Sequence, residues 1–451
     1  MPRPDDTIAA LATPAGTAAL AVIRLSGPAC AGLATELFGA APLPRSVRRA
    51  DYRDRAGRVL DDVLGTFFAG PRSYTGEDLL EISCHGNPFI AQAILGDLLA
   101  RGCRAAGPGE FTQRAFLNGR LDLSQAEAVM DLIHARSERA LAAAHRQLRG
   151  ALGRRMSALA DRLLGVLARV EAQIDFPEED LPPDDGAALR AAVGEILGET
   201  RRLLATGRYG ELLRDGVRTV ILGAPNAGKS SLLNRLVGRP RALVSPAPGT
   251  TRDFLEERVM AGPHCLRLTD TAGLNPFPDT IERLGIAQTH ACAAEADLLL
   301  LVLDATQPAP ALPPELAGRL SAAATIAVLN KCDLLAGAPA AVPPAGCPAV
   351  LVSATTGEGI DALVARIAAA ADGFRRDAGE DEVAINARHA RALELACERL
   401  GEVQAKLELP SPAELVASDL RDVLAAFGEI LGRIDNERML DQLFATFCIG
   451  K

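Results

Sequence analysis

The feature that most constrains the fold is a glycine-rich loop between a short apolar run and a helical one. Residues 217–222 form a run typical of a β-strand and lead into Gly223-Ala224-Pro225-Asn226-Ala227-Gly228-Lys229-Ser230. A helical pattern follows at once over residues 231–236. Strand, loop and helix in this order predict a phosphate-binding loop, in which backbone N–H groups at a helix N-terminus face phosphate. Lys229 would supply a point charge to the outer phosphates, and the Ser230 hydroxyl would ligate Mg²⁺.

Motifs farther along the chain select the base. Asn330-Lys331-Cys332-Asp333 resembles the guanine-recognition motif of GTPases, in which the Asp accepts hydrogen bonds from the N1–H and the exocyclic amine while the Lys stem lies along the base. Ser353-Ala354-Thr355 resembles the loop that donates a backbone N–H to guanine O6. Alone, residues 330–333 would also suit a turn at a strand end. In this order and spacing the motifs favour GTP over ATP.

The parts that hold the metal and the γ-phosphate are expected between these motifs. Asp270-Thr271-Ala272-Gly273 follows an apolar strand, which places a carboxylate for Mg²⁺ through water and a glycine N–H for the γ-phosphate. In the first switch, residues 249–253, Thr251 is the expected ligand of Mg²⁺ and the γ-phosphate. The predicted GTP contacts are Asn226, Ala227, Gly228, Lys229, Ser230, Ser231, Ser245, Pro246, Ala247, Pro248, Gly249, Thr250, Thr251, Asp270, Thr271, Ala272, Gly273, Asn330, Lys331, Asp333, Ser353, Ala354 and Thr355.

Hydrolysis at this site needs a device other than the usual glutamine. Leu274 occupies the position at which Ras-like GTPases carry the glutamine that orients the attacking water. A cation is also needed where an arginine finger would act. Asn226, with oxygens of the first switch from Ser245, Ala247 and Thr250, would enclose a monovalent cation beside the phosphates. We therefore expect potassium to act as the electrostatic element.

Composition and the spacing of apolar residues divide the chain into four segments. Residues 120–213 and 375–451 are rich in Ala, Leu, Arg and Glu and repeat apolar residues at helical spacing. Residues 214–374 alternate short β-type runs with helical segments, which predicts an α/β domain with a parallel sheet inserted into an all-α helical domain. Residues 1–119 mix strand-like pieces with short helices, so an α+β domain is expected. The expected helices are 122–171, 187–213, 388–407 and 412–447, and the expected strands are 20–25, 63–68, 79–83, 217–222, 298–303, 325–329 and 349–352.

Charge and cysteine usage limit location and partners. The formal net charge is -9, whereas dedicated nucleic-acid binders usually carry a basic surplus, so any RNA contact must be local or shared with a partner. Nine scattered cysteines without C-x-x-C spacing favour neither a disulfide framework nor a zinc site, which fits a reducing cytoplasm. The strongest apolar run, residues 298–303, is too short to span a bilayer. We expect a cytoplasmic protein without a membrane partner.

Taken together, these features resemble one family over essentially the whole chain. The phosphate loop with Asn226, residues 249–253, the inserted domain and the final Cys448-Ile449-Gly450-Lys451 are similar to those of the MnmE (TrmE) tRNA-modification GTPases. The resemblance implies a potassium-activated GTPase whose G domains dimerise head to head, with Asn226 coordinating potassium. It implies that Glu282 orients water indirectly and that Arg252 stabilises the dimer contact. A solvated carboxylate at a helix start and a surface arginine are the plainer alternatives for these two residues.

The resemblance also implies a second site in residues 1–119. This part is similar to a tetrahydrofolate-binding fold that forms the constitutive homodimer. Its contacts to 5-formyltetrahydrofolate or a related folate would match Arg24, Glu81, Arg120 and Lys451, although singly each suits a surface or turn position. Cys448 is either a nucleophile or redox residue or a thiol packed among aromatic neighbours. Only four of the 48 basic residues are lysines, and one of them ends the tail, which favours a function for the tail as a whole.

The function implied by the family is tRNA modification. With an FAD-dependent partner of the GidA/MnmG type in a heterotetramer, such proteins place an aminomethyl or carboxymethylaminomethyl group on carbon 5 of the wobble uridine of certain tRNAs, and folate supplies the one-carbon unit. A regulatory GTPase of ribosome assembly is the alternative, and an ATPase or small-molecule kinase is disfavoured by residues 330–333. Proline-rich stretches at 245–248 and 275–278 depart from the family pattern and restrict both switches.

Overall fold

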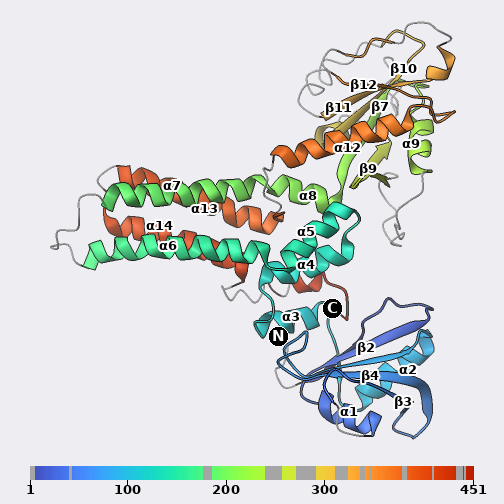
Figure 1. The fold of residues 1–451 in the computed structure, drawn as a ribbon, viewed down its shortest axis with the longest axis vertical. Coiled ribbons are helices and arrows are strands. Elements are labelled where there is room, and N and C mark those ends of the chain that lie inside the picture. Colours follow the sequence, from blue (N-terminus) through green and yellow to red (C-terminus); the bar gives the residue numbers. More distant parts are fainter. Residues whose placement is uncertain are drawn as a thin grey trace. The chain divides into compact units, whose positions relative to one another are not determined.

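The computed structural model divides the chain into two compact units. The first comprises Met1–Met130, Leu148–Ser157 and Gly428–Lys451, and the second comprises Asp131–Gln147 and Ala158–Phe427. Helices and strands carry the labels of Figure 1. The residues that the structure describes are 6–39, 43–175, 185–238, 256–270, 291–309, 324–335, 341–344, 347–377, 383–408, 411–432, 440 and 443–450.

The first unit is built on a mixed β-sheet. Its strands are β1 (Ile8–Leu11), β2 (Leu20–Ser26), β3 (Val47–Arg53), β4 (Val59–Phe68), β5 (Leu79–His85) and β6 (Arg104–Ala105). Their order is β3-β4-β5-β2-β1-β6, and the described pairs are antiparallel except for β1 with β6. Along β2, Ile23 and Leu25 are fully buried, whereas Arg24 between them is half-buried. This alternation is typical of a sheet with one covered face, and it confirms the predicted α+β class.

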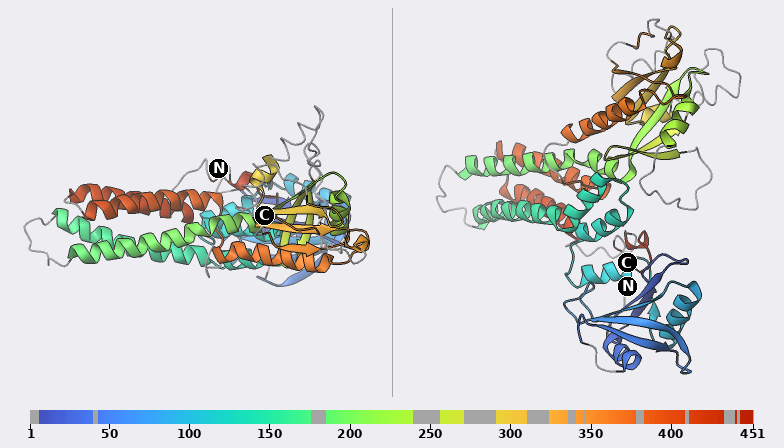
Figure 2. Two further views of the ribbon diagram at one scale, coloured as in Figure 1. Left: turned by 90° about the horizontal axis from the view of Figure 1, so that it is seen from above. Right: turned by 45° about the vertical axis from the view of Figure 1, so that its right-hand side comes forward.

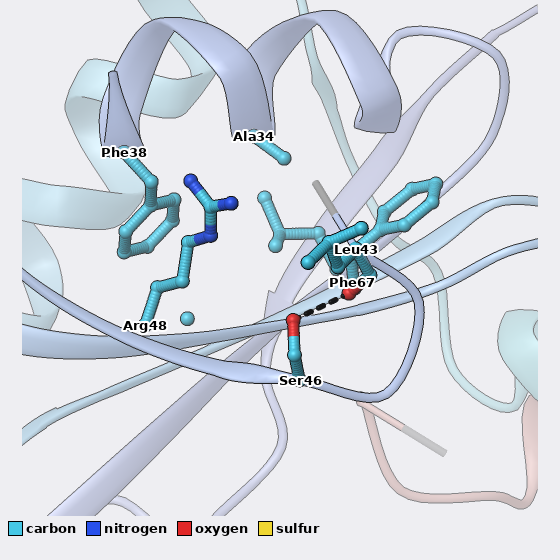
Figure 3. Close-up of a pocket in the computed structure, with 8 residues that line it drawn as sticks. Ala34, Phe38, Leu43, Ser46, Arg48 and Phe67 are labelled. Atoms are coloured by element: carbon cyan, nitrogen blue, oxygen red, sulfur yellow. Dashed lines mark hydrogen bonds between the residues drawn. The ribbon is translucent and has the colours of Figure 1, made fainter. Parts of the chain in front are cut away.

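Two helices cover the buried face of this sheet, α1 (Cys30–Phe38) and α2 (Pro88–Ala100). The contact of α1 with β4 depends on a glycine, because a Cβ on Gly65 would come within 2.1 Å of the Phe38 ring. Figure 3 shows this corner of the sheet, with Phe38 on α1 and the Arg48 side chain extending from β3 toward the helix. A larger residue at position 65 would therefore displace α1 from the sheet.

The C-terminal residues pack against helices of the same unit. These helices are α3 (Glu110–Leu117) and the first turns of α4 (Leu123–His134). Leu123 and Ala126 form a buried cluster with Phe444 and Phe447. Gly109 precedes α3 with φ 64, and a Cβ there would lie 2.8 Å from the Phe447 Cβ atom. The close approach and the left-handed backbone both require glycine at this position.

A bundle of long helices lies mainly in the second unit. They are α6 (Ala151–Asp175), α7 (Asp185–Ala205), α13 (Ala387–Glu408) and α14 (Ala413–Leu431). These helices lie side by side in Figures 1 and 2, and apolar residues at helical spacing along α13, such as Leu393, Ala396 and Leu400, are fully buried. Ion pairs such as Arg162 with Glu195 add to this packing at the surface. No helix in the described part of the chain has both the length and the apolarity needed to cross a bilayer.

Three predicted helices are interrupted. The helix expected over 412–447 ends at Leu431 of α14, because Gly432 adopts φ 73. The helix expected over 122–171 is wrong as a single element, because the structure has α4, α5 (Glu138–Leu148) and α6 there. Gly150 adopts φ 78, which ends the helical path, and the Ser137 hydroxyl accepts a hydrogen bond from the Ala140 N–H at the start of α5. The helix expected over 187–213 likewise divides into α7 and α8 (Gly207–Asp215). Thr206 lies at that break, and its hydroxyl donates to the Leu203 carbonyl at 2.7 Å.

The second unit also contains a largely parallel sheet. Its strands are β7 (Val217–Gly223), β8 (Glu256–Ala261), β9 (His264–Asp270), β10 (Leu298–Asp304), β11 (Ala324–Asn330) and β12 (Ala349–Leu351). Their order is β12-β11-β10-β7-β9-β8, and only β8 among the described strands pairs antiparallel. The parallel sheet predicted for residues 214–374 is therefore confirmed. β10 is buried on both faces, which explains its uninterrupted apolar run.

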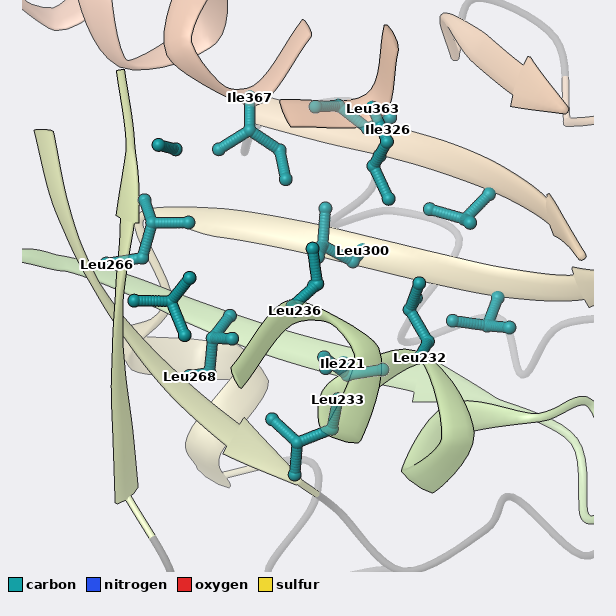
Figure 4. Packing of buried hydrophobic residues seen from close by; sticks show 14 of the residues in the cluster. Ile221, Leu232, Leu233, Leu236, Leu266, Leu268, Leu300, Ile326, Leu363 and Ile367 are labelled. Atoms are coloured by element: carbon teal, nitrogen blue, oxygen red, sulfur yellow. The ribbon is translucent and has the colours of Figure 1, made fainter. Parts of the chain in front are cut away.

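Helices α9 (Lys229–Val237) and α12 (Ile360–Asp377) cover one face of the parallel sheet. Leu232, Leu233 and Leu236 of α9 enter the same core as Leu300 and Ile326 of the strands (Figure 4). Since parallel strands all point the same way, the ends of β7, β10, β11 and β12 meet at one edge of the sheet. Ligands of open α/β sheets bind outside this carboxyl edge.

Candidate nucleotide-binding site

The phosphate loop joins β7 to α9 at the carboxyl edge of the parallel sheet. Asn226 and Gly228 both have left-handed backbones, with φ 62 and 95. A Cβ on Gly228 would lie 2.1 Å from the Asn330 amide nitrogen, so only glycine fits. Lys229 is buried, and its Nζ donates to the Gly223 and Ala224 carbonyls at 3.0 Å each. The Lys229 side chain therefore folds back onto the start of the phosphate loop.

The first turn of α9 provides donors for an anion. N–H groups in the first turn of a helix have no intrahelical acceptor, and the helix dipole favours negative charge there. Ser230 and Ser231 lie in this turn and are exposed. The exposed Ser230 hydroxyl at the helix start fits a ligand of phosphate-bound Mg²⁺, which prefers oxygen donors.

Several predicted residues lie outside the described part of the chain. These are Ser245, Pro246, Ala247, Pro248, Gly249, Thr250, Thr251, Arg252, Thr271, Ala272, Gly273, Glu282 and Lys451. Asp270 closes β9 next to β7, so the start of its motif lies at the edge of the sheet beside the phosphate loop. The described geometry thus concerns the phosphate loop and the base-recognition motifs.

Asn330 connects these two parts of the site. It ends β11 and is almost fully buried. Its amide nitrogen donates to the Ala227 carbonyl in the phosphate loop at 2.9 Å, and its Oδ1 accepts from the Ala354 N–H at 3.0 Å. A single side chain therefore fixes the phosphate loop and the loop after β12 relative to each other.

Lys331 and Asp333 follow Asn330 at the surface of the same edge. Lys331 has φ 66, and its Nζ donates to the Asp304 carboxylate at the end of β10 at 2.6 Å. Burial raises the pKa of Asp304, but the hydrogen bonds from Lys331 and Thr306 outweigh it and hold this pKa below its ordinary value. Asp333 is exposed, as a carboxylate that meets a base must be.

The loop after β12 is held by hydrogen bonds from two directions. Ser353 is buried, and its hydroxyl accepts from the Thr356 N–H at 3.0 Å. Arg235 of α9 donates from Nε to the Ala354 carbonyl at 2.9 Å and from its terminal nitrogen to the Thr355 carbonyl. Residues 330–333 and 353–355 therefore lie together at the carboxyl edge of the sheet.

A second set of predicted residues meets in the first unit. Arg24 on β2 lies directly opposite Glu81 on β5, and its guanidinium donates to Glu81 Oε1 at 2.7 and 2.9 Å. The same guanidinium lies 5.6 Å from the centre of the Tyr74 ring and 5.8 Å from that of Phe111. Arg120 lies against Gly76, two residues after Tyr74, where a Cβ would be 3.2 Å from its Cγ. One loop therefore contacts both arginines.

The C-terminal tail contacts β1 of the same sheet. The Cys448 carbonyl accepts from the Gly109 N–H at 3.2 Å, and Ile449 forms an antiparallel bridge with Pro108. A Cβ on Gly450 would lie 2.4 Å from the Leu11 carbonyl of β1, which pairs with the strand that carries Arg24. The Cys448 thiol is exposed. The structure thus places Gly450 against Leu11 of β1 and leaves the Cys448 thiol exposed.

Comparisons with known proteins agree on one family. Residues 123–448 match the MnmE helical domain, and residues 7–120 match the GTP-binding protein TrmE N-terminus. The tRNA modification GTPase MnmE of Opitutus terrae is 60% identical over 460 residues, with 100% of each chain covered. The chain belongs to the MnmE family.

Further comparisons add a more distant MnmE and one partial structure. The MnmE of Symbiobacterium thermophilum is 45% identical over 467 residues, which cover 99% of this chain and 100% of that protein. The crystal structure of the G domain of the T. maritima FeoB iron transporter is 26% identical and covers 34% of this chain and 98% of that chain. Its TM-score of 0.26 is too low to bear on the fold. The MnmE-family matches and the described elements establish a multidomain fold with an α+β N-terminal domain, a helical domain and an inserted α/β domain.

Two residues that contact the site motifs of this MnmE-family chain were not predicted from the sequence. Asp304, which holds Lys331, closes the apolar run of β10, and a carboxylate after a buried strand was the available signal. Arg235 lies six residues after Lys229 on the helix of the phosphate loop, where arginine is an ordinary surface residue. No local pattern distinguishes it, so only the structure reveals its contact with the loop after β12.

Proposed function

We propose that the protein hydrolyses GTP to GDP and phosphate at the carboxyl edge of its parallel sheet and acts in tRNA modification. The observation that supports this most is the position of Asn330, which bonds to Ala227 of the phosphate loop and to Ala354 of the base loop. Through these two hydrogen bonds, Asn330 would hold the phosphate-binding loop and the guanine-binding loop in a fixed relative position. The relatives at 60% and 45% identity are both named tRNA modification GTPases.

The phosphates would lie over the first turn of α9. Lys229 would exchange its bonds to the loop carbonyls for bonds to the outer phosphates, because a charged acceptor gives the stronger hydrogen bond. Ser230 and Thr251 would hold Mg²⁺, which when bound supplies positive charge to the phosphate oxygens. Asp333 would accept from the N1–H and the amine of guanine.

Potassium is the proposed second cation of this site. Asn226 is exposed in the phosphate loop, so its side-chain oxygen is accessible to an ion beside the phosphates. Ser245, Ala247 and Thr250 would contribute the remaining oxygens. Since Leu274 cannot orient water, we assign that role to Glu282, and Arg252 would stabilise the contact between two G domains in the dimer.

The first unit would bind the folate. Arg24 and Glu81 form a hydrogen-bonded pair beside two aromatic rings, which suits a flat ligand that carries both donors and carboxylates. Arg120 and Lys451 would complete the set. We propose that 5-formyltetrahydrofolate or a related folate supplies one carbon for carbon 5 of the wobble uridine, together with an FAD-dependent partner in a heterotetramer with the homodimer. Cys448, exposed on the neighbouring tail, would take part in this step.

The proposal is tested by nucleotide hydrolysis followed by a modification assay. The purified protein with Mg²⁺ and potassium should hydrolyse GTP and leave ATP unchanged. With the FAD-dependent partner, a folate and unmodified tRNA, it should form a modified wobble uridine that mass spectrometry detects. Equal hydrolysis of both nucleotides would refute the guanine assignment, and GTP hydrolysis that never supports modification would refute the role in tRNA chemistry.

A further inference from the structure

Arg235 lies outside the predicted motifs and contacts the loop that would meet guanine. Its Nε donates to the Ala354 carbonyl at 2.9 Å, and its terminal nitrogen donates to the Thr355 carbonyl. Arg235 belongs to α9, whose neighbouring Leu232 and Leu236 are buried in the core of the sheet (Figure 4). The guanidinium is therefore held by the same helix that would carry the phosphates.

Two backbone N–H groups of this loop also form hydrogen bonds within the protein. The Ala354 N–H donates to Asn330, and the Thr356 N–H donates to the Ser353 hydroxyl. Both carbonyls between them accept from Arg235. Within the described residues, the Thr355 N–H is the backbone donor between residues 354 and 356 that makes no hydrogen bond. An external acceptor can therefore bond there without breaking a contact of the loop.

The geometry of a peptide group links Arg235 to that donor. The Ala354 carbonyl and the Thr355 N–H belong to the same planar trans peptide and point in opposite directions. When Arg235 fixes the carbonyl, it also fixes the direction of the N–H. We propose that Arg235 is a positioning residue for base recognition, which orients the Thr355 N–H toward O6 of guanine. This inference rests on the proposed function, since it requires a guanine nucleotide in the site.

The chemistry of arginine suits this role better than that of lysine. A guanidinium presents several N–H donors in a fixed plane and can bond two carbonyls in one geometry, whereas an ammonium is a flexible point donor. Arg235→Lys should therefore retain the charge and lose much of the orientation. Arg235→Ala should lose both.

The experiment compares the affinities of GDP, 6-thio-GDP and ADP for the full chain and its variants by calorimetry. The 6-thio analogue replaces O6 with sulfur, a weaker acceptor, and keeps the N1–H and the amine. We expect Arg235→Ala to weaken GDP binding by about tenfold, the loss of one well-oriented hydrogen bond, and to narrow the preference for GDP over 6-thio-GDP by a similar factor. For Arg235→Lys, we expect a GDP affinity and a preference for GDP over 6-thio-GDP that lie between those of the unaltered chain and of Arg235→Ala. Arg366→Ala, an exposed arginine on α12, is the matched control and should leave both values unchanged.

Steady-state kinetics give a second measurement. KM for GTP should rise in Arg235→Ala while kcat at saturating GTP stays close to that of the unaltered chain, because the residue acts on the base and not on the γ-phosphate. An equal loss of affinity for GDP and 6-thio-GDP, or an unchanged affinity for GDP, would overturn the role of Arg235. If the unaltered chain binds ADP as tightly as GDP, the proposed function itself fails, and this inference fails with it.

Discussion

The two candidate sites of the molecule are assembled in different ways. The nucleotide site takes its residues from short motifs that follow parallel strands, and such strands bring their carboxyl ends to one edge. The site in the first unit takes single side chains from β2, β5, the loop around Tyr74 and the segment that follows α3. In the parallel sheet, the strand topology alone therefore brings the motifs together. In the antiparallel part of the first sheet, the pairing of Arg24 with Glu81 depends on the register between β2 and β5.

The electrostatic state of the two sites also differs. Lys229 bonds to two neutral backbone carbonyls, whereas Arg24 is already paired with a carboxylate. The outer phosphates of a nucleotide carry several negative charges, so Lys229 would form charge-assisted hydrogen bonds to them. An anion at Arg24 would have to share the guanidinium with Glu81. Loss of the cation should therefore have a larger effect in the nucleotide site, and the following predictions test this ranking.

The largest effect is expected from Lys229→Ala. It removes charge-assisted bonds to the outer phosphates, and GTP affinity should fall by about 1,000-fold. Fluorescence titration with a labelled GTP analogue measures this. Lys406→Ala, which removes the bundle lysine that pairs with Asp419, is the control and should leave GTP affinity unchanged. A Lys229 variant with normal affinity would contradict the phosphate-loop assignment.

Asp333→Asn should change the base that the site prefers. The amide can no longer accept from both the N1–H and the amine of guanine, so GTP affinity should fall by about 100-fold, the loss of two hydrogen bonds to a charged acceptor. Xanthine, which carries an oxygen in place of the amine, should become the better base. Competition between GTP and XTP measures the shift. Unchanged preference for GTP would mean that residues 330–333 do not contact the base.

Arg24→Ala should have a smaller effect, confined to the first unit. Binding of 5-formyltetrahydrofolate should weaken by about tenfold, because one charged donor is lost from the proposed pocket. GTP hydrolysis should stay the same. Arg49→Ala on β3 of the same sheet, where the arginine forms an exposed pair with Asp62, is the matched control. Equal folate binding by both variants would remove Arg24 from the proposed site.

The smallest change to the molecule is Cys448→Ser, which replaces one exposed sulfur atom. GTP hydrolysis should be unaffected, and formation of modified wobble uridine should fall, because serine is a much weaker nucleophile than a thiolate. Quantification of the modified nucleoside by mass spectrometry measures this. Full modification by the variant would assign Cys448 a packing role only.

The sequence predicts the strands of the parallel sheet better than the ends of the long helices. Residues 217–222, 298–303 and 325–329 are confirmed as strands because buried parallel strands are continuous apolar runs. The helix breaks at Gly150 and Thr206 were missed because one glycine or threonine in a helical pattern is tolerated as often as it ends a helix. Arg235 could not be predicted either, because its contact joins residues more than a hundred positions apart.

The most direct test of the account is steady-state GTP hydrolysis in matched potassium and sodium buffers, with the unaltered chain and Asn226→Ala. The proposed mechanism requires a monovalent cation, held by Asn226, that supplies the positive charge an arginine finger supplies in other GTPases. Potassium should strongly stimulate GTP hydrolysis by the unaltered chain. The Asn226→Ala variant should lose this stimulation and still bind GDP. Equal, slow rates in both salts would contradict cation-assisted hydrolysis and would make Asn226 an ordinary residue of the loop.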